Sequence, residues 1–433
     1  MKICHFSNSF IKIITADQVI ICDPWVGPGN HGGWHSTPEY NRQDLIAAVS
    51  DATVVYISHL HSDHFDPKFL TDSGLISKPF LIKKFQYPIM SNRLKNLGVN
   101  EIIEIESFDN YQLSANTNIT IVPQMTSNTA EEPDPVDFDL DTSIIVNSEN
   151  TTFFNQVDNP LSISDLTEVT TYISQTYGKL DIACFTCGAA SEYPQCFVNI
   201  DRNAEKERII RSSLNKLNKS LSLMKPTYFF LAGGAYFIPG RFFELNKYIA
   251  QPSLDEVETA VSENTTMLKP SGGQLIQVAS NVIKICNHVE PQVEDVQTSI
   301  QNHKNDAYHY ETLELPDQLE IQQNFKIAQY NYAEKTKQLE IELMRMIIFK
   351  IHNTLLFDDD INIKSKAVYN MVVNPNYDGE EILNIHIEEK AFWGCLNKKL
   401  IWNQVLSGSL CAYERVHNNY EPEALFSLNY LVK

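Results

Sequence analysis

The stretch that most constrains this chain is Ser58-His59-Leu60-His61-Ser62-Asp63-His64, which places three imidazoles and a carboxylate within six positions. It directly follows the apolar run Val54-Val55-Tyr56-Ile57, which is typical of a buried strand. Asp66-Pro67 comes next and predicts a helix start, with Asp as the N-cap and Pro at the first helical position. The four side chains are therefore expected on a loop between two rigid elements, which is what a metal site requires.

The spacing within this loop allows more than one ion. His59 and His61 can converge on one metal, while Asp63 and His64 point to a second position. Two-metal sites hold their ions roughly 3.5–4 Å apart and clamp both ends of a reacting group. A set of solvated loop histidines is the alternative, but imidazoles packed this closely would repel one another whenever they were protonated. We therefore predict a dinuclear metal site.

The H-x-H-x-D-H pattern resembles the metal-binding signature of the metallo-β-lactamase fold. Further segments resemble, in order, the lactamase-fold part of CMP-N-acetylneuraminate hydroxylase-like proteins: 23–25 with 33–34, 154–158, 188–197 and 231–239. The resemblance implies an α/β chain folded as a four-layer αββα sandwich, with a C-terminal α+β extension. It also implies an iron-dependent oxygenase rather than a zinc hydrolase.

In this fold the ligand that bridges two metals comes from a later strand end, and Asp158 is the candidate. It follows an apolar run that begins at Phe153, where a predicted strand ends in an acidic residue and a turn. An ordinary Asx turn explains the same pattern and would be preferred if the segment stood alone. Because the histidine loop is in the same chain, we predict that Asp158 is a ligand. Asp63 and Asp158 are also the predicted catalytic carboxylates.

The chain departs from the hydrolytic lactamase-fold enzymes in its lack of later imidazoles. Those enzymes are expected to supply one histidine before the bridging aspartate and one near the end of the domain, yet no histidine lies between His64 and His288. Carboxylates, amide oxygens, water or substrate would complete the site. The candidate side chains are Glu131, Glu132, Asp134, His5, His31 and His35. More oxygen ligands and open positions suit iron, although manganese or zinc could also fill such a site.

We therefore predict a non-haem diiron oxygenase that holds two Fe ions and hydroxylates a polar small molecule, such as a nucleotide sugar or a natural-product intermediate. The alternative is a zinc or manganese metallohydrolase acting on a phosphodiester, lactone or amide through a metal-bound water with a pKa of about 7. The predicted metal ligands are His59, His61, Asp63, His64 and Asp158. The side chains expected to shape the substrate pocket are Trp25, Trp34, His35, Ser191, Tyr193 and Tyr236.

A shift in composition predicts a catalytic domain over residues 1–290 and a helical and α+β domain over 291–433. Within the second, Leu319 to His352 shows a long helical pattern that could form core or a subunit contact, so a homo-oligomer is open. Residues 126–141 carry six acidic side chains and two prolines, which predicts a long exposed loop.

A Rieske cluster needs Cys-x-His and Cys-x-x-His pairs, and no Cys here has a His three residues on. An oxygenase would then need a separate electron donor. The net charge of −20 makes nucleic acid and anionic membrane poor partners. No run of 18 apolar residues and no signal-peptide core occur, and the eight cysteines lack a framework spacing. These features predict a cytoplasmic protein.

Overall fold

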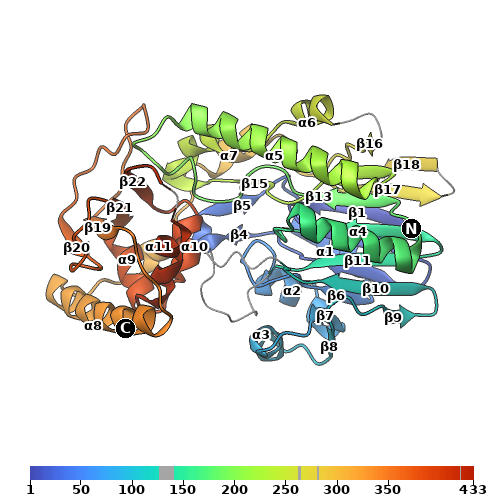
Figure 1. The fold of residues 1–433 in the computed structure, drawn as a ribbon, viewed down its shortest axis with the longest axis horizontal. Coiled ribbons are helices and arrows are strands. Elements are labelled where there is room, and N and C mark those ends of the chain that lie inside the picture. The colour runs from blue at the N-terminus through green and yellow to red at the C-terminus, as the bar shows by residue number, and fades with distance from the viewer. Residues whose placement is uncertain (126–140, 262–264, 280–281, 420) are drawn as a thin grey trace.

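Two large β-sheets face each other in the computed structural model, which describes residues 1–125, 141–261, 265–279, 282–419 and 421–433 (Figure 1). In spatial order, the described strands of the first sheet are β18 (Val282–Asn287), β17 (Gln274–Ala279), β1 (Lys2–Ser7), β2 (Phe10–Ile14), β3 (Val19–Cys22), β6 (Val54–Tyr56), β7 (Phe80–Lys83) and β8 (Ile102–Ile105). Those of the second are β16 (Thr266–Met267), β14 (Tyr228–Leu231), β13 (Ile182–Phe185), β12 (Thr151–Asn155), β11 (Ser143–Ser148), β10 (Thr117–Val122) and β9 (Tyr111–Ser114).

An apolar layer joins the two sheets. β-Branched and aromatic side chains such as Ile13, Ile121 and Phe153 are fully buried in it, because such residues fit a pleated surface that is covered by another sheet. Further apolar clusters lie on the outer faces, under helices. The helices on the two outer faces are α1 (Arg42–Val49), α2 (Pro67–Asp72) and α3 (Ile89–Leu97), then α4 (Ile163–Tyr177), α5 (Arg202–Met224) and α6 (Leu254–Ala260). The predicted αββα sandwich is confirmed.

Strand direction determines where the functional loops meet. β3, β6, β7 and β8 run parallel to one another, as do β12, β13 and β14 in the second sheet. The segments that follow β3, β6 and β12 are the loops at Asp23, at 57–64 and at Asp158. In open α/β sheets ligands bind beyond the carboxyl ends of the strands, and these three loops come together there.

A small sheet and a short helix lie at this edge of the sandwich. The sheet consists of β15 (Tyr236–Phe237), β5 (Trp34–Ser36) and β4 (Pro28–Gly29), with η1 (Asn30–Gly32) between the last two. Other connecting helices are η2 (Leu75–Ser77), η4 (Gly240–Tyr248), α7 (Val296–His303) and η5 (His309–Thr312).

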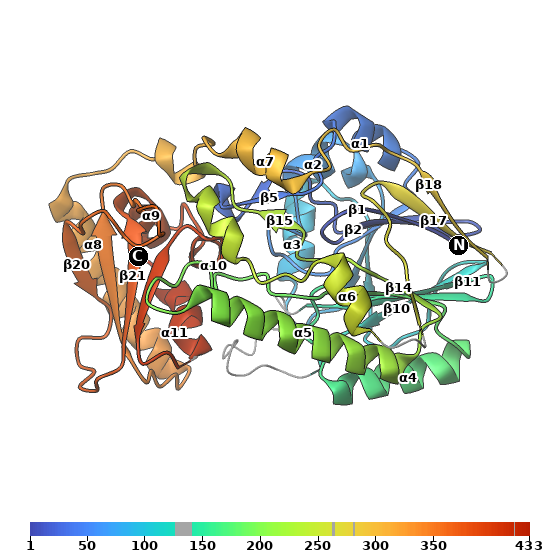
Figure 2. The same cartoon turned by 90° about the horizontal axis from the view of Figure 1, so that it is seen from above.

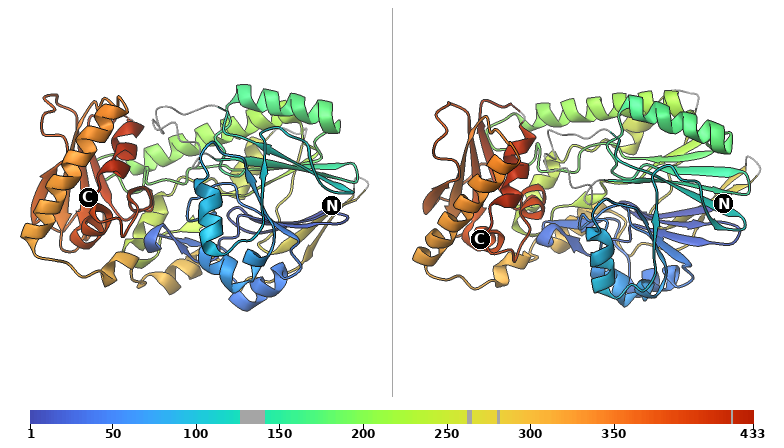
Figure 3. Two further views of the ribbon diagram at one scale, coloured as in Figure 1. Left: turned by 90° about the horizontal axis from the view of Figure 1, so that it is seen from below. Right: turned by 60° about the horizontal axis from the view of Figure 1, so that its bottom comes forward.

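The C-terminal part forms a layer of its own at the end of the molecule away from the N-terminus (Figures 1, 2 and 3). Its described strands are, in spatial order, β20 (Tyr369–Val372), β19 (Met346–His352), β21 (Ile382–Glu388) and β22 (Ala412–Val416). Its helices are α8 (Gln318–Gln338), α9 (Glu389–Leu396), α10 (Trp402–Ser407), α11 (Pro422–Phe426) and η6 (Ser427–Tyr430).

The helix predicted from Leu319 to His352 is wrong beyond residue 338. The chain turns at Glu340, which has a φ of +56°, and then enters a strand. In that strand Ile347, Phe349 and Ile351 are fully buried. This alternation has the period of two that a strand requires. Neighbouring apolar residues conceal the alternation in the sequence.

Packing continues from the first loops into the C-terminal layer. Trp25 and Trp34 belong to the same apolar cluster as Trp402 and Tyr413. The domain boundary near residue 290 stays a prediction. Among the helices of the described residues, none has the length and apolar character needed to span a membrane.

Candidate metal centre

Asp66 fixes the end of the histidine loop. As predicted, Asp66 caps α2: its Oδ1 accepts a hydrogen bond from the amide of Phe69 at 2.9 Å, and Pro67 is the first helical residue. The other oxygen, Oδ2, accepts from the amides of Val26 and Gly27, each at 3.3 Å. The carboxylate therefore joins the loop after β3 to the helix after the histidines.

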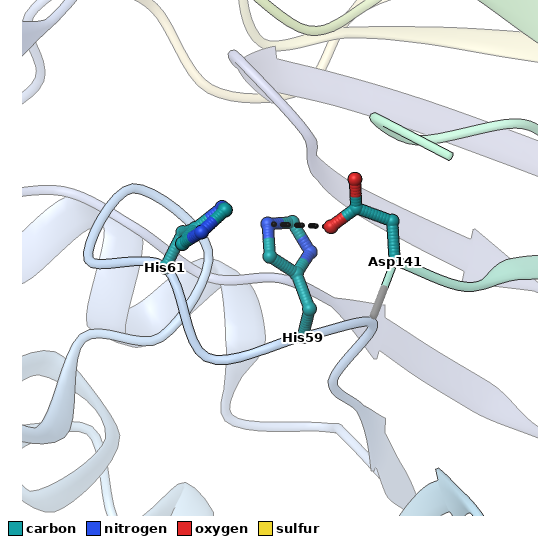
Figure 4. A group of neighbouring side chains, drawn as sticks. All are labelled: His59, His61 and Asp141. Atoms are coloured by element: carbon teal, nitrogen blue, oxygen red, sulfur yellow. Dashed lines mark ion pairs between the residues drawn. The ribbon is translucent and has the colours of Figure 1, made fainter. Parts of the chain in front are cut away.

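One group of potential ligands combines His59, His61 and Asp141. Their ligand atoms all lie within 4.8 Å of one another. His59 Nε2 and Asp141 Oδ1 are 3.3 Å apart, and Figure 4 shows the three side chains converging from the histidine loop and from the segment before β11. Two imidazoles and one carboxylate leave further positions open for water or substrate, as catalytic metal sites require.

A second group combines His59, His64 and Asp158, whose ligand atoms also lie within 4.8 Å of one another. His64 Nε2 lies 3.1 Å from Asp158 Oδ2 and 3.5 Å from Asp63 Oδ2. The rings of His59 and His64 are 4.1 Å apart between centroids. The two groups share His59, so the donors surround adjoining positions rather than separate ones.

Asp23 determines which nitrogen of His59 faces the site. Ser58 Oγ donates to Asp23 Oδ2 at 2.7 Å and therefore must accept from His59 Nδ1, which lies 2.8 Å away. The proton of His59 is on Nδ1, which leaves the Nε2 lone pair for a ligand. Burial, followed by the neighbouring His64 and His61, lowers the pKa of His59 well below its ordinary value, so the ring is neutral.

His64 is oriented by the same carboxylate. Its Nδ1 lies 3.2 Å from Asp23 Oδ2, so the proton on Nδ1 is donated to Asp23 and Nε2 faces Asp158. Burial by itself lowers the pKa of His64, but the charges of Asp158 and Asp63 outweigh it and hold the pKa well above its ordinary value. Positive charge is therefore favoured beside Nε2.

Asp141 is held by a buried chain of hydroxyl groups. Its neighbour Thr142 donates from Oγ1 to the carbonyl of Ser58 at 2.9 Å. Thr142 Oγ1 lies 2.7 Å from the hydroxyl of Tyr56, which must then be the donor. Tyr56 is in β6 and Thr142 immediately precedes β11, so this chain ties the second sheet to the histidine loop.

The donor set fits a pair of metal ions. His59 Nε2 is buried and makes no hydrogen bond, although its lone pair points at Asp141. A buried nitrogen without a partner costs free energy unless a cation binds it. The carboxylates of Asp63, Asp141 and Asp158 converge on the same place from three segments, and their mutual repulsion favours bound cations.

Asp141 is the ligand candidate that the sequence did not single out. It is the last residue of the acidic segment 126–141, whose composition predicts an exposed loop. Asp141 lies just before β11, and β11 pairs with β12, the strand that leads to Asp158. An acidic residue at the start of that strand was the available signal. Glu131, Glu132 and Asp134, and the rest of the predicted loop before Asp141, lie outside the described residues.

The remaining candidate histidines bind elsewhere. His5 Nε2 donates to the carbonyl of Asn8 at 2.7 Å, and His31 Nε2 accepts from the amide of Ile401 at 3.0 Å. The ring of His35 stacks on Phe237 with centroids 5.2 Å apart. None of these three imidazoles belongs to either group of potential ligands among the described residues.

The aromatic side chains predicted for the pocket are mostly buried. Trp25 is 1% exposed, and the ring of Trp34 stacks on Tyr236 with centroids 4.0 Å apart. Burial, followed by the charges of Cys196 and Asp63, raises the pKa of Tyr236. Their role in binding substrate stays a prediction.

The segment with Ser191 and Tyr193 lies against the C-terminal layer. The amide of Tyr193 donates to Ser191 Oγ at 3.3 Å, and the hydroxyl of Tyr193 donates to Glu205 Oε2 at 2.7 Å. The ring of Tyr193 also faces the guanidinium of Arg415 in β22, 5.2 Å from the centroid. Contact of either side chain with a substrate stays a prediction.

Known proteins resemble parts of this chain, and no protein-family model matches it. A stretch of 198 residues, 46% of the chain, is 25% identical to a Mycobacterium tuberculosis protein named "Putative Rieske 2Fe-2S iron-sulfur protein" and covers 36% of that protein. A stretch of 70 residues, 15% of the chain, is 36% identical to cytidine monophosphate-N-acetylneuraminic acid hydroxylase of Asterias rubens and covers 10% of it. The chain thus spans well under half the length of these curated relatives.

Two solved structures illustrate the fold. CmlA, a diiron β-hydroxylase from Streptomyces venezuelae, is 12% identical, with a TM-score of 0.41 over 61% of this chain and 52% of that chain. The metallo-β-lactamase fold protein YhfI from Bacillus subtilis is 12% identical, with a TM-score of 0.38 over 63% of this chain and 97% of that chain.

The chain is an αββα sandwich and resembles proteins of the metallo-β-lactamase fold. Its two facing sheets with helices outside carry the H-x-H-x-D-H loop at the carboxyl ends of parallel strands. The resemblance to the lactamase-fold part of the CMP-N-acetylneuraminate hydroxylases is confirmed by the partial sequence matches. The two groups of His and Asp side chains could hold a pair of metal ions.

Proposed function

We propose that this chain is a non-haem diiron oxygenase that hydroxylates a polar small molecule, such as a nucleotide sugar or a natural-product intermediate. The observation that carries the proposal is the pair of ligand groups that share His59, with Asp141 in one and Asp158 in the other. When bound there, two iron ions would supply a binding place for dioxygen and the redox change that hydroxylation needs.

The chemistry of the donors favours iron over zinc. Three imidazoles are joined by the carboxylates of Asp63, Asp141 and Asp158, so half of the six candidate donors are oxygen ligands. Structural zinc sites are closed by four imidazole or thiolate ligands, whereas oxygen-rich sites with open positions suit iron that must bind a gas. The described cysteines do not contribute to either group.

The protein's own residues would position the reacting groups. Asp23 fixes the orientation of His64 directly and that of His59 through Ser58, so the two rings have little freedom to turn. Asp63 and Asp158 flank His64 Nε2 and could hold or release a proton there. Packed side chains such as Trp34 would exclude water from one side of the site.

Electrons would come from a separate donor. The mycobacterial relative is named as a Rieske iron–sulfur protein, whereas these 433 residues contain no Cys-x-x-His pair, which a Rieske cluster needs beside a Cys-x-His pair. A reduced protein or small reductant would therefore have to deliver electrons to the centre between turnovers.

A zinc or manganese hydrolase acting on a phosphodiester, lactone or amide is the second candidate. Asp63 favours it, because this carboxylate belongs to neither three-residue group yet lies 3.5 Å from His64 Nε2. A carboxylate in that place could orient an attacking water. The absence of further imidazoles from the described ligand groups counts against a hydrolytic zinc site.

Metal content separates the two candidates. Protein purified without oxygen is expected to contain about two iron ions per chain, as a two-metal site requires. After reduction, this protein should consume dioxygen rapidly. Asp141→Asn should lose about one iron per chain and most of the oxygen consumption.

Asp72→Asn is the matched control, because Asp72 is an exposed carboxylate that pairs with Arg42 and Lys68 on the surface. It should keep both the iron and the oxygen consumption. Active protein that contains only zinc and hydrolyses an ester or lactone without consuming dioxygen would overturn the oxygenase and support the hydrolase.

A further inference from the structure

A second set of reactive side chains lies in the C-terminal layer and forms an unbroken row of hydrogen bonds. Ser365 Oγ lies 3.0 Å from His352 Nδ1, and His352 Nε2 lies 2.9 Å from His386 Nδ1. His386 Nε2 lies 3.2 Å from Glu414 Oε2. The row contains no member of the metal ligand groups.

Every proton in this row can be assigned. The hydrogen bond from His386 lowers the pKa of Glu414, so the carboxylate is ionised and accepts from His386 Nε2. With the neutral tautomer of His386 that carries its proton on Nε2, Nδ1 accepts from His352 Nε2, which leaves a lone pair on His352 Nδ1. Ser365 Oγ therefore donates to His352, while it accepts from the amide of Leu356 at 3.1 Å.

The sheet holds the two imidazoles on one face. His352, His386 and Glu414 come from the neighbouring strands β19, β21 and β22, in register positions that alternate with the buried apolar face of Ile351. His352 is 1% exposed, whereas Ser365 at one end of the row is half-buried and can be reached from solvent.

We propose that Ser365 is a nucleophile for acyl esters, with His352 as its base and with His386 and Glu414 as positioning residues. A nucleophile bound to a base that a third group orients is the arrangement of hydrolases that form acyl-enzymes. Because Leu356 and Ser365 are joined by a hydrogen bond, the hydroxyl is also held in one orientation.

The step balances without a cofactor. Ser365 Oγ forms a bond to the carbonyl carbon of the ester, the bond from that carbon to the alcohol oxygen breaks, and the serine proton passes through His352 Nδ1 to the departing alkoxide. Water then attacks the acyl-serine, gives its proton through the same nitrogen to Ser365, and releases the carboxylic acid.

A cavity lies between η4 and the segment that follows β19, and it has a volume of about 320 Å³. Apolar side chains of Phe242, Leu245, Leu355, Leu356 and Phe357 line it together with the charged side chains of Arg241, Glu244, Asp358 and Asp359. Leu356, one of the lining residues, donates its amide to Ser365 Oγ, so this cavity is the candidate place for the acyl group.

A fluorophosphonate probe tests the proposal on the full chain after its metals have been removed with a chelator. We expect covalent labelling with loss of fluoride, and peptide mass spectrometry should locate the label at Ser365. Ser365→Ala should abolish labelling. Ser77→Ala, which removes an exposed hydroxyl that only binds the carbonyl of Gly74, should label as the unaltered chain does.

Glu414→Gln tests the positioning role, because the amide oxygen can still accept from His386 but carries no charge. The maximal labelling rate should fall at least about tenfold while the half-saturating probe concentration stays unchanged. The proposal is overturned if the unaltered chain labels no faster than Ser365→Ala, or if Glu414→Gln labels at the original maximal rate.

Discussion

His64 Nδ1 and Asp23 Oδ2 lie 3.2 Å apart in the fully buried interior, and the same carboxylate oxygen accepts the hydroxyl of Ser58. Asp23 follows β3 directly and has a φ of +43°, so the backbone turns to aim its side chain at the histidine loop. Two potential ligands, His59 and His64, are thus oriented by one carboxylate that belongs to neither ligand group.

Asp23→Asn should weaken metal binding without removing a ligand. The amide is nearly the same size, but in either orientation its Nδ2 faces a donor: the amide of Ser58, or His64 Nδ1 and Ser58 Oγ. The contacts that orient the two rings are therefore weakened. Loss of such an outer partner typically lowers metal affinity by about 10–100-fold. Titration with a competing chelator would measure the change.

The control for this prediction is again Asp72→Asn, which should bind metal as the unaltered chain does. Equal affinities of Asp23→Asn and the unaltered chain would show that the two imidazoles are held by other contacts.

Thr142→Val should reduce both stability and metal binding. The change keeps the shape of the side chain but leaves the carbonyl of Ser58 and the hydroxyl of Tyr56 buried without their partner. Buried groups left without a hydrogen bond cost about 1–3 kcal/mol in the free energy of unfolding. Denaturant unfolding of the metal-free chain measures this cost.

Thr167→Val provides the comparison, because this hydroxyl is exposed on α4 and binds the carbonyl of Ile163 one turn earlier. It should change the free energy of unfolding by less than about 0.5 kcal/mol. If the two valine variants were equally stable, the hydroxyl chain would not be what holds Asp141 beside the histidines.

His303 should contribute stability that depends on pH. Its Nε2 lies 2.9 Å from Glu39 Oε2 and its Nδ1 lies 2.6 Å from Asp306 Oδ2. Burial by itself lowers the pKa of His303, but the two carboxylates outweigh it and the pKa is raised. A raised pKa in the folded state gives stability that is complete below the unfolded pKa, and it is lost as pH rises through the folded pKa.

The difference in unfolding free energy between the unaltered chain and His303→Gln should therefore be larger at pH 5.5 than at pH 9, where the imidazole is neutral in both states. The chain without its metals should be used, so that metal binding does not alter the comparison. A difference that was the same at both pH values would contradict the charged contact.

Local sequence signals predicted the histidine loop at 59–64. The position of Asp141 depends on contacts between segments that are far apart in the sequence. The buried run before His59 and the Asp66-Pro67 helix start are properties of adjacent residues. Asp141 becomes a ligand candidate only because β11 pairs between β10 and β12. No local pattern in an acidic segment distinguishes the one carboxylate that this pairing brings to the histidines.

The same limit explains the aromatic residues of the early loops. The Gly, Pro and Trp residues at 23–35 are typical of a loop, and the structure shows an irregular segment with two short strands there. The burial of Trp25 and Trp34 depends on the C-terminal layer, which covers them from more than 300 residues away in the case of Trp402. Sequence spacing contains no information about that contact.

Gly233 follows β14 and lies against the candidate ligand Asp158, so replacement by alanine should affect both folding and metal binding. Its φ is +93°, and its amide donates to the carbonyl of Asn8 at 2.9 Å. An added Cβ would lie 2.4 Å from Thr186 Cγ2 and 3.1 Å from Asp158 Oδ1. The chain would have to shift, and Asp158 with it.

Gly74→Ala separates the cost of a side chain in the left-handed backbone from the cost of overpacking. Gly74 also has a positive φ, +72°, but nothing lies within 4 Å of an added Cβ. Both variants should lose about 1 kcal/mol from the left-handed backbone, and Gly233→Ala should lose a further 1–3 kcal/mol or so from overpacking. Only Gly233→Ala should also lower metal affinity, because only there does the new methyl group press on a candidate ligand. Equal losses of stability and unchanged metal binding in both variants would mean that Asp158 is not held against Gly233.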